Sequence, residues 1–332
     1  MRLHAIVVAV LFAGTTAVLA QTSGTATPES LIVAAKRAAG QDHAGTFLRI
    51  CVAPDNLGPG RAGGAGRGAT NAAPAVPDRA SWYAQPYKVF DNFYFVGTKI
   101  HSAWALTTSQ GIIVIDTLYD YAIEPEIVDG LTKLHLNPRD IKYVLISHAH
   151  GDHDQSAALL QNRYGAKVVM GTADWDTTLK RPATAAGGVP KRDIAVEGDG
   201  RKITLGDTTV DVIATPGHTP GTLSYIFPVK DAGRTLTVAY SGGTAFNFPR
   251  QAQAFAIYRD SQKKMGDAVR AAGATILMSN HTEFDRAYDR VRLAQLRRAA
   301  GEKHPYETDT QTVQRYFEMT ADCAEAQRLL TN

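Results

Sequence analysis

A cluster of metal-binding residue types lies in the middle of the chain. Four donors fall within six residues, directly after a short apolar run: His148, His150, Asp152 and His153. Imidazole nitrogen and carboxylate oxygen suit a borderline ion such as zinc. Four donors exceed what one tetrahedral ion takes from a single loop, so the cluster predicts two neighbouring ions with further ligands elsewhere. The alternative is a polar loop with solvated histidines, which the density of the cluster disfavours.

Two later histidines would complete these sites. His218 lies in a turn rich in proline and glycine at residues 215–221, and His281 follows another apolar run. Six donors divide into two sets: His148, His150 and His218 on one zinc ion, and Asp152, His153 and His281 on the other. Each of the two Zn²⁺ ions then keeps an open position, which is typical of catalytic zinc. Such a pair can hold a bridging hydroxide that is nucleophilic at neutral pH, and we expect Asp152 to be both a ligand and a catalytic residue.

The roles of four further residues are less certain. Asp116 ends a predicted strand and would either orient a ligand imidazole or be an ordinary turn residue. His101 is expected at the surface, with contact to substrate as the alternative. The two cysteines, Cys51 and Cys323, have no metal role. In an oxidising compartment they would form one disulfide between the two ends of the chain, or remain separate thiols.

The first residues have the pattern of a secretory signal peptide. Arg2 precedes an apolar run at residues 5–19, and small residues stand before Gln21. We expect residues 1–20 to be a leader cleaved near Ala20, and the alternative is an uncleaved anchor. The mature protein is then periplasmic or secreted, with no other membrane segment.

Composition limits the classes of function. The chain has 332 residues, of which 44% are hydrophobic, and a formal net charge of +3. This length supports one large domain or two small ones. The near balance of charge, without a basic run interleaved with aromatics, argues against a nucleic-acid partner.

The elements that position the donors alternate between strands and helices. Residues 21–80 are an N-terminal segment with a helix at 30–39 and a Gly/Ala/Pro-rich linker at 54–80. Residues 81–332 are expected to form one catalytic domain with a C-terminal helical extension, and the loop at 180–191 is expected to border a substrate groove. Strands are predicted at 89–96, 104–108, 111–116, 141–146, 167–170, 202–205, 208–214, 222–227, 235–240 and 275–278. Helices are predicted at 123–136, 155–164, 173–179, 260–272, 284–299 and 310–330. Strands and then helices, twice over, suit a four-layer α/β sandwich.

The order of these motifs resembles the metallo-β-lactamase superfamily. The resemblance rests on the stretch from His148 to His153, the turn around His218, and His281, and it spans about residues 82 to 300. It implies the αββα fold, a di-zinc site at the edge of the sandwich, and hydrolysis at a carbonyl or phosphoryl centre.

Two features narrow the resemblance. Glyoxalase II and the lactonases of this fold bridge their metals with an aspartate, yet residues 240–247 contain no acidic residue. The subclass with a cysteine ligand is disfavoured, because neither cysteine lies there. The chain therefore looks like the secreted di-zinc subclass with Asp-His-His at its second ion. Two departures are Thr282, where that subclass usually has proline, and Asp154, an added charge beside the metals.

This resemblance implies a zinc-dependent hydrolase that opens the β-lactam ring of antibiotics by attack of a metal-bound hydroxide. The partner is a small molecule, and the hydroxyls of Thr222, Ser224 and Ser241 are candidate contacts for its carboxylate. One alternative is a di-zinc lactonase or esterase of the same fold. A non-catalytic extracellular binding protein with a vestigial site is another. A nuclease of this fold is disfavoured by the near-neutral charge.

Overall fold

The computed structural model describes residues 26–52, 76–297, 299 and 301–331. The predicted leader at residues 1–20, with its cleavage site, lies outside these residues, as does most of the predicted linker. Across the described ranges, no helix is both long and apolar enough to cross a membrane.

Seven strands form the first sheet, in the order of the chain. They are β1 (Tyr87–Phe90), β2 (Phe93–Phe95), β3 (Trp104–Thr108), β4 (Gly111–Ile115), β5 (Ile141–Leu145), β6 (Lys167–Gly171) and β7 (Ile194–Val196). Neighbours from β1 to β4 are antiparallel, and those from β4 to β7 are parallel. The single strand predicted at 89–96 is wrong: Asp91 and Asn92, both common in turns, break it into the hairpin β1–β2. The short edge strand β7 was not predicted.

Five strands form the second sheet, in the order β12-β11-β10-β9-β8. Their bounds are β8 (Gly200–Leu205), β9 (Thr208–Ala214), β10 (Leu223–Asp231), β11 (Arg234–Ser241) and β12 (Ile276–Ser279). Only β11 and β12 pair in parallel. As a result β9, β11 and β12 all run in the same direction, and their carboxyl ends lie at one edge of the sheet.

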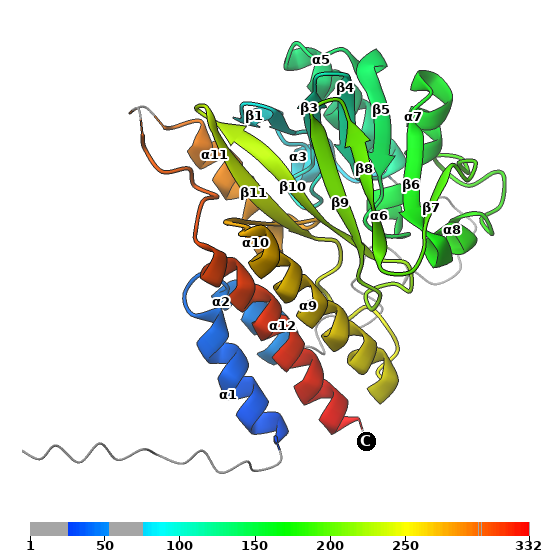
Figure 1. Ribbon diagram of the computed structural model, residues 1–332. Coiled ribbons are helices and arrows are strands. Elements are labelled where there is room, and N and C mark those ends of the chain that lie inside the picture. Colours follow the sequence, from blue (N-terminus) through cyan, green and yellow to red (C-terminus); the bar gives the residue numbers. More distant parts are fainter. Residues whose placement is uncertain (1–25, 53–75, 298, 300, 332) are drawn as a thin grey trace, which may run out of the picture.

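Helices cover the outer faces of both sheets (Figure 1). The α-helices are α1 (Pro28–Ala39), α2 (Ala44–Phe47), α3 (Arg79–Trp82), α4 (Asp120–Ala122), α5 (Asp129–Lys133), α6 (Gly151–Asp154), α7 (Ala157–Tyr164), α8 (Thr172–Thr178), α9 (Ala252–Ala272), α10 (Thr282–Asp285), α11 (Ala287–Ala294) and α12 (Thr310–Leu330). Short helices of other types are η1 (Leu48–Val52), η3 (Ile123–Val128) and η4 (Pro138–Asp140). The helix predicted at 260–272 begins earlier, at Ala252, and the one predicted at 284–299 is divided between α10 and α11. The four-layer αββα sandwich is confirmed.

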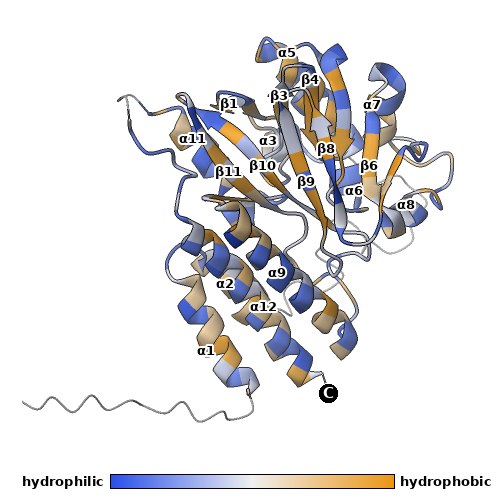
Figure 2. Ribbon diagram, in the orientation of Figure 1, coloured by the Kyte–Doolittle hydropathy of each residue, from blue (hydrophilic) through white to orange (hydrophobic). Residues whose placement is uncertain are grey.

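Three apolar clusters hold the layers together. The central cluster lies between the two sheets and is built from alternate strand residues, including Phe93, Trp104 and Tyr225. A second cluster joins the first sheet to α5, η3 and α7, and a third joins the second sheet to α9 and α12. Figure 2 shows the same pattern, with hydrophobic residues concentrated along the strands. This packing holds the edges of both sheets in fixed positions.

The carboxyl ends of β5, β9, β11 and β12 lie at one edge of the sandwich. The backbone N–H of Leu223, which begins β10, donates to the carbonyl of Ser147 at 2.8 Å. Ser147 follows β5, and so does the cluster of donors. The loops after β5, β9, β11 and β12 therefore lie at a common edge, where the donors that the sequence separates can meet.

The N-terminal segment packs against the last helix rather than standing apart. The predicted helix at 30–39 is confirmed as α1, which begins with a capping box between Thr27 and Ser30. Figure 1 shows α1 beside α12. Cys51 in η1 and Cys323 in α12 form a disulfide that joins residues 272 positions apart. Of the two alternatives for the cysteines, the structure has the bridged one.

Candidate metal centre

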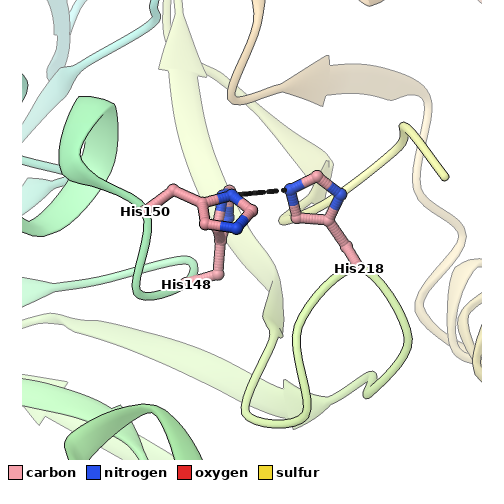
Figure 3. Close-up of side chains that lie close together, drawn as sticks. All are labelled: His148, His150 and His218. Carbon is pink, nitrogen blue, oxygen red and sulfur yellow. Dashed lines mark hydrogen bonds between the residues drawn. The ribbon is translucent and has the colours of Figure 1, made fainter. Parts of the chain in front are cut away.

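Three histidines from two loops converge at the edge of the sandwich. His148 and His150 follow β5, and His218 lies in the turn between β9 and β10. The Nε2 atom of His218 lies 3.1 Å from Nε2 of His148 and 3.2 Å from Nδ1 of His150. Figure 3 shows the three rings pointing toward one another. These three nitrogens form a group that could hold one metal ion.

The Nδ1 atoms of His148 and His218 point away from the three converging nitrogens, and their hydrogen bonds favour a cation between the rings. Nδ1 of His148 lies 2.9 Å from the carbonyl oxygen of Gly242, and Nδ1 of His218 lies 2.7 Å from that of Ala245. A carbonyl only accepts, so both Nδ1 atoms must carry the proton. Burial lowers the pKa of His148 well below its usual value and that of His218 to about 3, so both rings are neutral. Their Nε2 lone pairs therefore face each other, which a bound cation would stabilise.

A second group of donors lies beside the first. Oδ2 of Asp152 is 3.3 Å from Nε2 of His153 and 3.2 Å from Nε2 of His281, and these two nitrogens are 3.1 Å apart. The rings of His148 and His153 are 4.4 Å apart, so the two groups are neighbours. Although burial opposes it, the facing histidines hold the pKa of Asp152 well below its usual value. The site therefore contains an anionic oxygen among imidazole nitrogens, a donor set that fits zinc.

Asp116 fixes the second group from behind. Its Oδ2 atom accepts from Nδ1 of His153 at 2.9 Å, and its Oδ1 atom accepts from the backbone N–H of Ser147 at 2.7 Å. The side chain is fully buried. Its φ angle of 61° is unusual for a residue other than glycine and carries backbone strain. Of the two alternatives raised by the sequence, the structure has Asp116 in contact with a site imidazole, the arrangement that sets ring tautomers in metal sites.

Asp174 joins the two loops that carry the first group, and sequence reasoning missed it. It lies in α8, just after β6, and is buried. Its carboxylate accepts from the backbone N–H of Ala149 at 2.9 Å, from Oγ1 of Thr219 at 2.7 Å and from the backbone N–H of Gly221 at 3.0 Å. The signal for it was an aspartate near the carboxyl end of a parallel strand, the same signal that singled out Asp116.

Asn280 supports the first group in a similar way and was also missed. Its Nδ2 atom donates to the carbonyl of Gly242 at 2.7 Å.

Gly242 and Gly243 pack so closely that neither has room for a side chain. A Cβ atom would lie 1.7 Å from the carbonyl oxygen of Leu223 at Gly242, and 2.5 Å from Cβ of His218 at Gly243. A bridging carboxylate at these two positions is therefore sterically excluded.

The added charge of Asp154 is neutralised within the protein. Its side chain is fully buried and forms an ion pair with Arg181 at 2.8 Å, and Oγ1 of Thr178 donates to it at 2.7 Å. Arg181 also donates to the carbonyl of Ala149 at 3.1 Å. The predicted loop at 180–191 is thus tied to the donor cluster through this arginine.

The three predicted substrate hydroxyls lie inside the protein. Thr222 bonds with Thr219 at 2.8 Å, Ser224 with Thr215 at 2.8 Å, and Ser241 with Thr244 at 3.3 Å. All three candidate residues are buried. Contact between these hydroxyls and a substrate stays a prediction.

The surface position expected for His101 is wrong. Its side chain is 13% exposed, and its Nε2 atom lies 3.5 Å from Oδ2 of Asp152. The loop between β2 and β3 brings it there, because His101 pairs through a β-bridge with His281. Nothing in the spacing of the sequence indicated this pairing between distant segments.

A cavity of about 580 Å³ lies next to the turn that carries His218. It is lined by β6, α9 and the turn itself, with Pro216, Thr222 and Lys264 among its walls. None of the six predicted donors lines this cavity, so we assign the chemistry to the donor cluster and not to this cavity.

The fold and the motifs match known proteins. Residues 96–233 match the family model of the metallo-β-lactamase superfamily. The structure is similar to that of a subclass B3 metallo-β-lactamase of Bradyrhizobium japonicum, with 28% identity and a TM-score of 0.59. That likeness covers 71% of this chain and 91% of the other. The metallo-β-lactamase fold implies that the protein binds a divalent metal, typically zinc.

Similarity to curated sequences is more local. A hydroxyacylglutathione hydrolase of Acidiphilium cryptum is 37% identical over 87 residues, which is 26% of this chain and 31% of that protein. An N-acyl homoserine lactonase of Agrobacterium fabrum is 29% identical over 127 residues, 34% of this chain and 47% of that protein. The chain thus matches less than half the length of these two relatives.

Proposed function

Because the chain contains a metallo-β-lactamase superfamily domain, we propose that it is a zinc-dependent hydrolase that opens the β-lactam ring of antibiotics. The pair of adjacent donor groups, His148, His150 and His218 beside Asp152, His153 and His281, supports a zinc-dependent hydrolase. The observation that carries the choice of a β-lactam is the close packing of Gly242 and Gly243, which leaves no room for a bridging carboxylate. Zinc, when bound, lowers the pKa of water and polarises a carbonyl oxygen. Such chemistry suits the cleavage of a strained cyclic amide.

The residues of this chain prepare the site for that reaction. The carbonyls of Gly242 and Ala245 hold His148 and His218 in one tautomer, and Asp116 does so for His153. Acceptors that bind the ring N–H opposite the metal-binding nitrogen make the imidazole a stronger ligand and fix the orientation of the ring. Asp152 is anionic and is the carboxylate among the six donors. We therefore assign it the acceptance of the proton that the attacking water releases and the delivery of that proton to the departing amide nitrogen.

Substrate would enter on the side of the partly exposed rings. His150, His281 and Tyr119 are all partly exposed. Tyr119 stacks on Tyr121 with ring centroids 5.4 Å apart, and it contacts His101 edge-on at the same distance. We assign this pair of tyrosines to the apolar face of the substrate. Thr222, Ser224 and Ser241 remain the proposed partners of its carboxylate.

The packing of Gly242 and Gly243 favours a β-lactamase over the carboxylate-bridged hydrolases of this fold. The local similarity to a hydroxyacylglutathione hydrolase and a lactonase supports the second candidate, an enzyme for thioesters or lactones. These relatives match the chain only in part. The two candidates share the donor groups and differ in substrate.

The disulfide supports a location outside the cytoplasm. Disulfides persist in oxidising compartments and are rare in the cytosol, and Cys51 and Cys323 are bridged. We therefore propose a periplasmic or secreted enzyme with a cleaved leader. Cell fractionation and the N-terminal sequence of the exported protein test this location.

A substrate panel tests the activity. The zinc-loaded protein without its predicted leader is assayed with nitrocefin, a carbapenem, an N-acyl homoserine lactone and a hydroxyacylglutathione. We expect turnover of a β-lactam that a chelator abolishes. The His150→Ala variant should lose more activity than the roughly 10- to 100-fold that is typical when a residue that hydrogen-bonds a metal ligand is replaced. β-Lactam turnover no faster than that of His150→Ala would refute the proposal, and lactone or thioester turnover would then support the second candidate.

A further inference from the structure

The segment that carries His101 is clamped to the segment that carries His281. The backbone N–H of Ser102 donates to the carbonyl of Asn280 at 2.8 Å, and that of Thr282 donates to the carbonyl of Ile100 at 2.9 Å. On the other side of the turn, Oγ1 of Thr98 accepts from the backbone N–H of His101 at 2.8 Å. These bonds fix the backbone of His101 beside that of His281.

The side chain of His101 faces the second donor group. Its Nε2 atom lies 3.5 Å from Oδ2 of Asp152, and its ring meets that of His281 edge-on with centroids 5.1 Å apart. The donor atoms of His101, Asp152 and His281 all lie within 4.8 Å of one another. Two donors on one tetrahedral zinc ion are about 3.3 Å apart, given Zn–N and Zn–O distances of about 2.0–2.1 Å. The separation between His101 and Asp152 is close to that value.

We propose that His101 is a fourth protein ligand of the metal ion held by Asp152, His153 and His281. The first group, by contrast, has three histidines, so the two ions would differ in the number of protein ligands. The open position for a reactant would then belong mainly to the ion at His148, His150 and His218. This inference rests on the proposed metal binding but not on the identity of the substrate.

Two other roles would place His101 at the same point. It could donate a hydrogen bond to Asp152 without touching the ion, or it could contact substrate. Both would keep the ring near Asp152, so distance alone does not separate them from a ligand. A direct count of coordinated imidazoles does.

Cobalt substitution provides this count. In the protein loaded with two Co²⁺ ions, each coordinated imidazole carries one ring N–H proton whose NMR signal the paramagnetic ion shifts strongly. We expect six such signals in the parent protein, five from the predicted histidine ligands and one from His101. The variants His101→Ala and His101→Gln should each show five. A parent spectrum with five, or variants that keep every signal, would overturn the proposal.

Zinc affinity provides an independent readout. Competition with a chromophoric chelator should show that both His101 variants bind one ion as the parent does, and the other at least about 100-fold more weakly. His135→Asn is the matched control, because His135 is an exposed residue just after α5 with a φ of 59° that asparagine tolerates. Unchanged affinity in the His101 variants, with a raised KM, would assign His101 to the substrate instead.

Folding and function are checked separately. Far-ultraviolet circular dichroism and thermal unfolding of the metal-free variants should match those of the metal-free parent protein. A match shows that weaker zinc binding by a variant does not result from a loss of folded structure. An absence of β-lactam turnover would refute the proposed substrate, yet it would leave the cobalt and zinc measurements fully interpretable.

Discussion

The carboxylate of Asp116 holds two parts of the metal centre together. It contacts the ring of His153 and both the backbone and the hydroxyl of Ser147, which begins the donor loop. It does so from a left-handed backbone conformation that the surrounding sheet must maintain. A single side chain thus sets both the tautomer of a ligand and the path of the loop.

Replacing Asp116 by asparagine tests this arrangement. The amide keeps the shape but removes the negative charge behind His153, so its imidazole becomes a weaker donor. We expect a loss of about 10- to 100-fold in affinity for the second zinc ion, measured by chelator competition. Asp120→Asn is the control, because Asp120 is an exposed acid in α4. Equal zinc affinity in Asp116→Asn and the control would contradict the role.

Glu126 is a buried acid remote from the metals that should make stability depend on pH. Oε1 accepts from the backbone N–H of Ala84 at 2.9 Å, whereas Oε2 is buried without a hydrogen-bond partner. Burial raises the pKa of Glu126 from 4.5 to about 8. The folded protein therefore keeps a proton that the unfolded chain loses between these values. In that window the free energy of unfolding should fall as pH rises, by up to about 1.4 kcal/mol per pH unit.

The variant Glu126→Gln should remove this slope. Glutamine keeps the acceptor for Ala84 and does not ionise, so the variant should gain stability over the parent as pH rises from 5 to about 8. Urea unfolding at a series of pH values measures the effect. Parallel stability curves for parent and variant across this range would show that Glu126 is ionised in the folded state.

At the scale of elements, the N-terminal segment buttresses the loop that carries His281. Oγ1 of Thr46 in α2 donates to the carbonyl of Phe284 at 3.0 Å, and Arg49 in η1 forms an ion pair with Glu283 at 3.0 Å. Both partners belong to α10, which begins directly after His281. The disulfide anchors η1 in this position from the side of α12.

Breaking the disulfide should destabilise the whole layer of helices. The bond closes a very long loop and so restricts the unfolded chain, and we expect reduction to lower the free energy of unfolding by about 2–4 kcal/mol. Denaturant titration with and without reductant measures this change. The double variant Cys51→Ala/Cys323→Ala should resemble the reduced protein and be insensitive to reductant. A reduced protein as stable as the oxidised one would refute the expectation.

The sequence allowed the strands and the donor loops to be predicted, because each apolar run ends at a polar cluster. The loops after β5, β9 and β12 were identified in this way, with His148, His218 and His281 on them. It did not reveal His101, since its place depends on a bridge between segments 180 positions apart in the chain. Nor did aromatic and β-branched composition distinguish one strand from the hairpin β1–β2, where only Asp91 and Asn92 mark the turn.

For the molecule as a whole, the metal centre should contribute to stability as well as to chemistry. It joins loops from both sheets, and Nε2 of His148 lies 3.1 Å from Nε2 of His218. Ligands that bind only the folded state stabilise it, by about 4 kcal/mol at a thousandfold excess over Kd. We therefore expect a chelator to lower the melting temperature, measured by calorimetry, and zinc to restore it. The chelator should lower the melting temperature of His150→Ala by less than that of the parent protein. An unchanged melting temperature in the parent protein would argue against tight zinc binding.

The packing of α1 on α12 also has a consequence for biosynthesis. Between Cys51 and Cys323 lie both sheets, and the ribosome completes them before α12 exists. At about 5–20 residues per second, α1 waits on the order of 10 to 60 seconds for its partner. Throughout that interval the faces of Ala35 and Ala39, buried in the finished protein, are uncovered. Helix α1 is thus among the last elements to reach its final packing, because its partner α12 is synthesised near the end of the chain.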